Sequence, residues 1–186
     1  LSFADINYLQ PGAISDVDLS GNPSGVARVL GERANDLTGQ SVAVGDLNRD
    51  GFADVIAGAP GSFLTDDRES ETPGKAFVVY GRAAMPPVVD LSANPAMVSR
   101  ITGANGYLPN TGFSDRAGQS VASGDFNGDG FSDLIAGAPG ADPNGRTNAG
   151  QAYLYYGGAT LTEPVRLSGG AAGDGLGSSV CAGDLN

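Results

Sequence analysis

Short apolar runs, each bounded by glycine or polar residues, follow one another along the whole chain. The runs at 41–44, 54–57 and 76–81 are rich in β-branched and aromatic residues. Apolar positions do not recur with a helical period, and such runs between turn residues are typical of β-strands. The 186 residues include 30 glycines and 11 prolines, which separate these runs. The pattern therefore predicts an all-β protein made of short strands.

The order of these runs is itself repeated. One unit holds four strand-like runs: one before an acidic loop, one after it, a tyrosine-containing run, and a run ending in Arg-x-x-Gly. The tyrosine-containing run at 76–81 matches 152–157, and the arginine run at 100–103 matches 28–31 and 166–169. Units of four short strands are typical of β-propeller blades. We therefore expect four-stranded antiparallel blades.

The repeats divide residues 1–186 into parts of a single propeller domain. The expected parts are the second half of one blade (1–31), two full blades (37–103 and 113–169) and the first strand of another blade (176–186). A closed propeller needs about four to eight blades, so this chain forms only part of one. The remaining blades are expected to come from a cleaved parent protein or from a second chain.

Each full unit contains a loop in which oxygen-bearing side chains occupy positions 1, 3, 5 and 9. Position 7 can add a backbone carbonyl, and a glycine at position 6 suits the sharp turn that the loop requires. The expected ligands of the first loop are Asp46, Asn48, Asp50, Phe52 through its carbonyl, and Asp54. Those of the second loop are Asp125, Asn127, Asp129, Phe131 through its carbonyl, and Asp133. A third copy of the repeat begins at Gly177 and supplies Asp184 and Asn186 as the first expected ligands of another loop.

Calcium is the metal that this donor set favours. Calcium takes about six to eight oxygen ligands in flexible geometry, whereas magnesium requires a stricter octahedron. The chain has no histidine and one cysteine, Cys181, which we expect to be a small buried residue, so zinc and copper are disfavoured. An EF-hand would need a glutamate at position 12 and flanking helices, but Ala57 and Ala136 stand there between strand-like runs. The alternative is a pair of acidic turns without metal.

These motifs together resemble the FG-GAP repeat of the integrin α-subunit β-propeller and its bacterial relatives. The residues that carry the resemblance are Gly58-Ala59-Pro60, Gly137-Ala138-Pro139 and the two acidic loops. The Phe-Gly half of the motif is replaced by Thr38-Gly39, Ala117-Gly118 and Leu176-Gly177. The resemblance implies that each loop joins the first two strands of a blade and binds calcium on one face of the propeller through the residues named above.

Charge and hydropathy limit the classes of partner that this chain is expected to bind. The formal net charge of −11 disfavours binding to nucleic acid or to an anionic membrane surface. No apolar run reaches the roughly 18 residues of a membrane span. Calcium loops of this kind suit the high calcium concentration outside cells, which places the protein in the extracellular space or at the cell surface.

Two functions remain in view. The first is a non-catalytic, calcium-binding propeller for adhesion or protein recognition, as the resemblance implies. The alternative is a carbohydrate-binding propeller, or the non-catalytic propeller portion of a secreted enzyme. Catalysis is disfavoured because the chain has no histidine, no Gly-x-Ser-x-Gly motif and no evident pair of nucleophile and base. Either a protein or a glycan therefore remains as the expected ligand.

Overall fold

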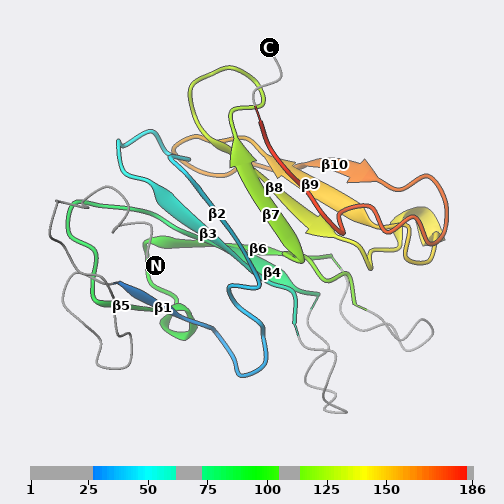
Figure 1. Ribbon diagram of the computed structural model, residues 1–186, viewed down its shortest axis with the longest axis horizontal. Helices are drawn as coiled ribbons and strands as arrows, with labels where there is room; N and C mark the ends of the chain where they lie inside the picture. Colours follow the sequence, from blue (N-terminus) through cyan, green and yellow to red (C-terminus); the bar gives the residue numbers. More distant parts are fainter. Residues whose placement is uncertain (1–26, 62–72, 105–113, 184–186) are drawn as a thin grey trace, which may run out of the picture.

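The computed structural model describes residues 27–61, 73–104 and 114–183, and it consists almost entirely of strands and loops (Figure 1). Two four-stranded antiparallel sheets account for most of the strands. The first sheet contains β2 (Ser41–Gly45), β3 (Asp54–Ala59), β4 (Lys75–Val79) and β6 (Val98–Thr102). The second contains β7 (Ser120–Gly124), β8 (Asp133–Ala138), β9 (Gln151–Tyr155) and β10 (Val165–Ser168).

Both sheets are simple meanders with the same register. Their strand orders are β2-β3-β4-β6 and β7-β8-β9-β10. Strands that are neighbours in a sheet are therefore also consecutive along the chain, except that β5 lies between β4 and β6 in the sequence. The innermost hairpins end on equivalent pairs, Gly45 opposite Asp54 and Gly124 opposite Asp133. The expected fold class, an all-β partial propeller of four-stranded antiparallel blades, is confirmed. The sheets lie within 37–103 and 113–169, and the full division of the chain into blades stays a prediction.

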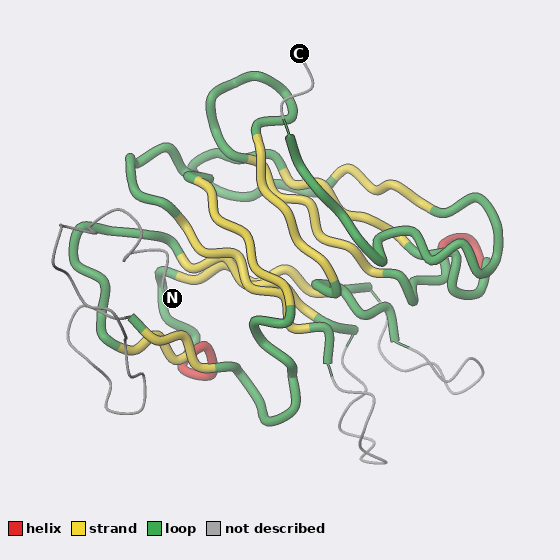
Figure 2. Tube along the Cα trace, in the orientation of Figure 1, coloured by secondary structure: helices red, strands yellow, loops and turns green. Residues whose placement is uncertain are grey.

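A short parallel pair flanks the first sheet and was not predicted. β1 (Arg28–Leu30) pairs with β5 (Val88–Asp90), and a 3-10 turn, η2 (Leu91–Ala93), follows β5. We expected residues 1–31 to form half of a preceding blade; residues 1–26 lie outside the described part. β1 pairs here with the connection between β4 and β6, far from the second sheet (Figure 2).

The main core lies between the two sheets. Its buried residues are Leu47, Ile56, Ala76, Val78 and Ile101 from the first unit and Val121, Leu134 and Ala136 from the second. A separate cluster around Phe77, Leu91 and Met97 fills the other face of the first sheet beneath η2. Both faces of β4 are therefore covered, which explains its nearly continuous apolar sequence.

Two glycines of the repeat allow the sheets to approach each other closely. A Cβ added to Gly58 would lie 2.1 Å from the carbonyl oxygen of Gly118, and one added to Gly137 would lie 2.0 Å from that of Gly177. Gly118 also has a φ of 82°, where side chains are strained. The glycine of Gly-Ala-Pro in one unit thus packs on the glycine that begins the next unit, so the motif is a contact between blades.

The third copy follows this contact but forms no strand within the described residues. The Oγ of Ser120 donates to the carbonyl of Gly177 at 2.8 Å, as Ser41 donates to Gly118 at 2.9 Å. Residues 178–183 are not assigned to a strand, because no described strand pairs with them. Cys181 is exposed rather than buried. The expected ligands Asp184 and Asn186 lie outside the described part.

Candidate metal loops

The two acidic loops occupy equivalent places, at the hairpin ends of β2–β3 and β7–β8. Because β2 and β7 lie side by side, both loops emerge at the same edge of the molecule (Figure 1). The final strand pairs bring position 9 of each loop beside the residue that precedes position 1. The hairpin register thus closes each nine-residue loop.

In the first loop, the side chains at positions 1 and 3 accept hydrogen bonds from the same backbone amide, and the side chain at position 5 accepts from another. The N–H of Asp50 donates to Asp46 Oδ1 and to Asn48 Oδ1, each at 3.1 Å. Gly51 N donates to Asp46 Oδ2 at 3.0 Å, and Phe52 N donates to Asp50 Oδ1 at 2.9 Å. Gly51 has a φ of 86°, which allows the sharp turn at position 6.

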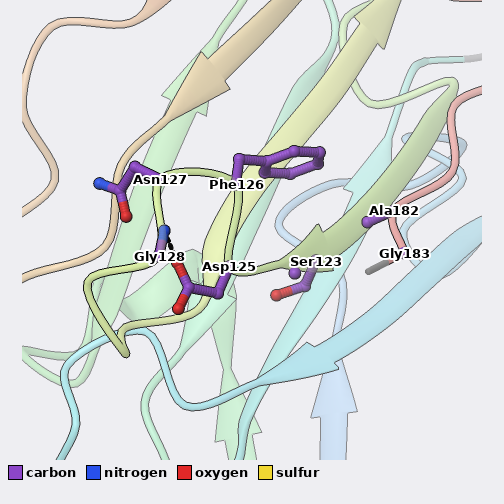
Figure 3. Close-up of a pocket in the computed structure, with 8 residues that line it drawn as sticks. Ser123, Asp125, Phe126, Asn127, Gly128, Ala182 and Gly183 are labelled. Atoms are coloured by element: carbon purple, nitrogen blue, oxygen red, sulfur yellow. Dashed lines mark hydrogen bonds between the residues drawn. The ribbon is translucent and has the colours of Figure 1, made fainter. Parts of the chain in front are cut away.

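The second loop repeats these contacts residue by residue. Asp129 N donates to Asp125 Oδ1 at 3.2 Å and to Asn127 Oδ1 at 3.0 Å, and Gly130 N donates to Asp125 Oδ2 at 2.8 Å. Gly128 N adds a further bond to Asp125 Oδ1 at 2.7 Å, visible in Figure 3. These donors, Gly130 first, hold the pKa of Asp125 below its usual value. The conformation therefore belongs to the motif and is not particular to one copy.

The aspartate at position 9 is fully buried in both loops. Asp54 accepts 2.8 Å bonds from the backbone N–H groups of Leu47 and Gly81, and Asp133 accepts the same bonds from Phe126 and Gly157. Burial raises the pKa of Asp54; its two backbone donors oppose this, and the nearby Asp50 and Asp46 charges add to it. This carboxylate thus ties the loop to the end of the third strand, a structural role that the ligand spacing alone did not indicate.

Both loops lie in segments that match a known repeat family. The sequence profile of the FG-GAP repeat family matches residues 38–79 and 117–155, each of which spans one inner hairpin and the strand after it. The chain carries FG-GAP repeats. The two matched stretches contain both acidic loops and both Gly-Ala-Pro segments.

Two groups of relatives share these repeats. Over 119 residues, or 64% of this chain, it is 34% identical to phosphatidylinositol-glycan-specific phospholipase D of Rattus norvegicus. The human protein of that name is 32% identical over 152 residues. Integrin alpha-7 of Rattus norvegicus is 34% identical over 145 residues, or 76% of this chain. The alignments span only 13%, 17% and 11% of these relatives, so the FG-GAP chain corresponds to a small part of each.

The donor chemistry of the FG-GAP loops fits calcium. Each loop offers carboxylate, amide and carbonyl oxygens with no nitrogen or sulfur ligand, the set that hard cations prefer. Each carboxylate oxygen that accepts one N–H keeps a second lone-pair site. Within residues 27–61, 73–104 and 114–183, no group of three or more acidic, histidine or cysteine side chains is already arranged as a metal cluster. The ligand assignment accordingly stays a prediction.

A cavity of about 520 Å³ lies beside the second FG-GAP loop (Figure 3). Residues 123–128 form one wall, and Ala182 and Gly183, which precede the third copy of the loop in the sequence, form the other. The second loop therefore adjoins the segment that leads to the third copy. This neighbourhood follows from the stacking of blades and was not evident from the loop spacing.

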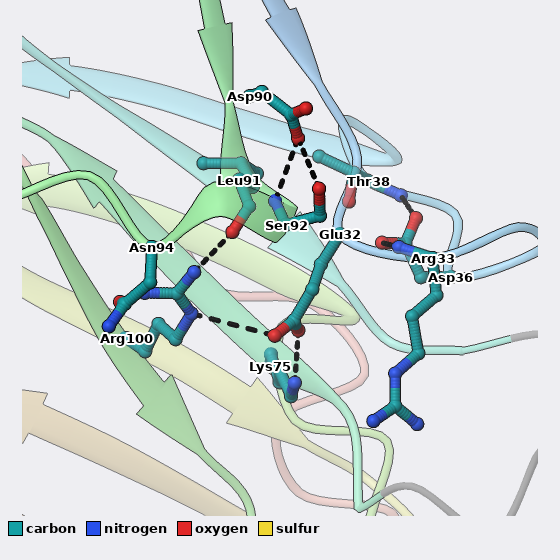
Figure 4. A network of polar contacts seen from close by, with 10 residues as sticks. All are labelled: Glu32, Arg33, Asp36, Thr38, Lys75, Asp90, Leu91, Ser92, Asn94 and Arg100. Atoms are coloured by element: carbon teal, nitrogen blue, oxygen red, sulfur yellow. Dashed lines mark hydrogen bonds and ion pairs between the residues drawn. The ribbon is translucent and has the colours of Figure 1, made fainter.

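Sequence reasoning also missed a polar network on the first FG-GAP unit (Figure 4). Arg100 donates to the carbonyl of Leu91 and to Asn94 Oδ1, lies 3.6 Å from Glu32 Oε1, and stacks 5.6 Å from the centre of the Phe77 ring. Glu32 also pairs with Lys75. The repeated Arg-x-x-Gly was a usable signal, but its partners come from three separate segments and only the fold reveals them.

Proposed function

We propose that this chain is part of a calcium-stabilised FG-GAP propeller that serves recognition or adhesion and not catalysis. The observation that carries the proposal is the duplication of one loop. The loops that begin at Asp46 and Asp125 lie 79 positions apart (125 minus 46). They carry the same oxygen-bearing side chains, and backbone amides hold these side chains in the same arrangement. A pair of ordinary polar turns would not need the same oxygen at four matching positions.

Within each loop, the side chains at positions 1, 3, 5 and 9 and the carbonyl at position 7 are the proposed ligands. Bound calcium supplies the positive charge that offsets three carboxylates in one short loop. The chain itself contributes the loop shape, because backbone amides already orient the oxygens of positions 1, 3 and 5. The buried Asp54 and Asp133 anchor the loops to the blades.

Recognition outside the cell is supported by the integrin alpha relatives and by the net charge of −11, which disfavours nucleic acid as a partner. None of the described helices is both long and apolar enough to cross a membrane. The second candidate is a carbohydrate-binding propeller, or the non-catalytic propeller portion of a secreted enzyme. The phospholipase D relatives favour this candidate. A glycan array probed with the full chain separates the two: selective glycan binding would support the second candidate and count against a purely protein-directed module.

We further propose that other blades pack on this unit. Ala43 faces the core between the sheets, so its neighbour Val42 points to the opposite face, where it is 53% exposed. Val165 and Leu167 are exposed on β10, the outer edge of the second sheet. Apolar residues on the open faces of stacked sheets are expected where another sheet packs. The additional blades would belong to the same parent protein or to a second chain.

Calcium titration by calorimetry tests the proposed sites. The full chain is compared with the isosteric variants Asp50→Asn and Asp129→Asn, and with Asp90→Asn as a control for loss of one exposed carboxylate outside the loops. We expect each loop variant to lose one calcium per molecule and the control to lose none. Unchanged calcium binding in both loop variants would overturn the assignment.

A further inference from the structure

The first loop contributes its backbone to the second loop. The carbonyl of Asp46, at position 1 of the first loop, accepts a hydrogen bond from Ser132 N at 3.0 Å. Ser132 lies between Phe131 and Asp133, the residues at positions 7 and 9 of the second loop. The backbone between two proposed ligands of the second loop is thus held by Asp46, a proposed ligand of the first loop.

A second contact runs through the end of β9. Gly158 N donates to the carbonyl of Leu47 at 2.8 Å, and the adjacent Gly157 N donates to Asp133 Oδ1 at 2.8 Å. Consecutive amides of one segment therefore hold the first loop and the buried carboxylate of the second. A change in the backbone of either loop must displace this shared segment.

Arg49 adds a side-chain link between the loops. Its Nη1 donates to the carbonyl of Asp129 at 3.3 Å, and its guanidinium carbon lies 5.6 Å from the centre of the Phe131 ring. A Cβ added to Gly130 would lie 3.2 Å from that same carbon, so the guanidinium rests directly on the second loop. The second loop has Gly128 at the matching position and cannot make such a contact with the third copy.

From these contacts we infer that the two loops form one coupled calcium-binding unit, in which Arg49 is a positioning residue for the second loop. This inference rests on the proposed calcium function. Calcium binding to one loop restricts the motion of the carbonyls that hold the other loop. The second calcium ion therefore causes a smaller loss of conformational entropy when it binds. Calcium in either loop then raises the affinity of the other, by the same factor in both directions.

The burial of the loops agrees with this arrangement. Asp46 and Asn48 of the first loop are half-buried, whereas Asp125 and Asn127 are exposed. Towards the ends of the loops the order is reversed, because Phe131 is half-buried and Phe52 is exposed. The covered parts of the pair are thus the start of the first loop and the end of the second, where the carbonyl of Asp46 meets Ser132 N.

The test measures this factor in the full chain by calorimetric titration with calcium alone. The affinity of the second loop is measured with the first loop intact and again in Asp46→Asn/Asp50→Asn; the affinity of the first loop is measured with and without Asp125→Asn/Asp129→Asn. Asparagine keeps an oxygen acceptor for the loop amides, and circular dichroism checks that each variant is folded. We expect both affinities to fall by the same factor, about tenfold.

The variant Arg49→Met tests whether the contact of the Arg49 guanidinium with the second loop carries the coupling. A second arginine variant controls for the loss of one positive charge. Arg49→Met should lower the coupling factor at least about threefold, while Arg33→Met, which removes an exposed arginine from the connection between β1 and β2, should leave it unchanged. Melting temperatures at matched calcium concentrations provide a second readout. Two loops that bind calcium with a coupling factor of one would overturn the inference and leave the proposed function standing. If neither loop binds calcium, both fail.

Discussion

The outer strands of the two sheets differ more than their inner hairpins do. β6 is at least half-buried along most of its length, whereas its counterpart β10 is exposed at every residue. Arg100 on β6 meets Glu32, Asn94, a carbonyl and an aromatic ring, while the matching Arg166 on β10 is exposed. The inner hairpins, in contrast, share their register and the loop hydrogen bonds of positions 1, 3, 5 and 9, apart from the one that Gly128 N adds in the second loop.

The difference shows which parts of a blade depend on its neighbours. An inner hairpin is specified by its own glycines, aspartates and apolar alternation, because its loop contacts are local in sequence. An outer strand gains burial only where another segment covers it, as η2 and the residues after β1 cover the first sheet. The following predictions test this division, beginning with the largest effect.

Adding a methyl group at the contact between units should give the largest loss of stability. Gly58→Ala and Gly137→Ala both place a Cβ about 2 Å from a backbone carbonyl that cannot move aside. We expect each to lower the free energy of unfolding by about 4 kcal/mol or more, in the range of severe overpacking. Urea denaturation measures the loss. Gly173→Ala, at an open turn with a φ of 82°, is the control and should cost only about 1 kcal/mol.

Removing calcium should come next. With calcium at about a hundred times its dissociation constant, each site contributes about 2.7 kcal/mol of stability. Excess chelator should therefore lower the melting temperature, and Asp50→Ala or Asp129→Ala should reproduce part of the loss. A melting temperature that chelator leaves unchanged would contradict a structural role for the metal.

Substitution of the outer-strand arginines probes the difference between the sheets directly. Arg100→Met removes a hydrogen-bonded, half-buried guanidinium and should cost about 1–2 kcal/mol. Arg166→Met, on the exposed β10, should change the free energy of unfolding by less than about 0.5 kcal/mol. Parallel thermal melts of the two variants suffice. Equal effects would mean that β10 is covered by a segment as β6 is.

The smallest effect concerns Tyr153, which stands in β9 where β4 has Phe77. Burial first, and the charge of Asp115 second, raise the pKa of Tyr153 to about 12. The folded state then holds the phenol proton more tightly than the unfolded state, whose pKa is about 10. Its contribution to stability is complete below about pH 10 and declines as the pH rises toward 12. Absorbance titration of the wild type against Tyr153→Phe isolates this group; a midpoint near 10 would refute the prediction.

The sequence alone was enough for the all-β class, the four-stranded unit, the repeat family and the acidic loops. These features depend on contacts within one unit: alternating apolar residues pair along a hairpin, and aspartates cap nearby amides of their own loop. Such short-range interactions leave a regular spacing in the chain. That spacing also identified Arg100 as a repeated residue, although it did not reveal the partners of that residue.

Only the tertiary structure decided which residues that are distant in the sequence meet. It placed Asp54 and Asp133 in full burial beneath their loops, paired β1 with β5 in parallel, and set Arg49 against the second loop. Among the residues that the structure describes, 178–183 pair with no strand. These outcomes depend on which distant segments meet, and the repeated spacing does not indicate those contacts. The packing of one unit on the next therefore had to be seen in three dimensions.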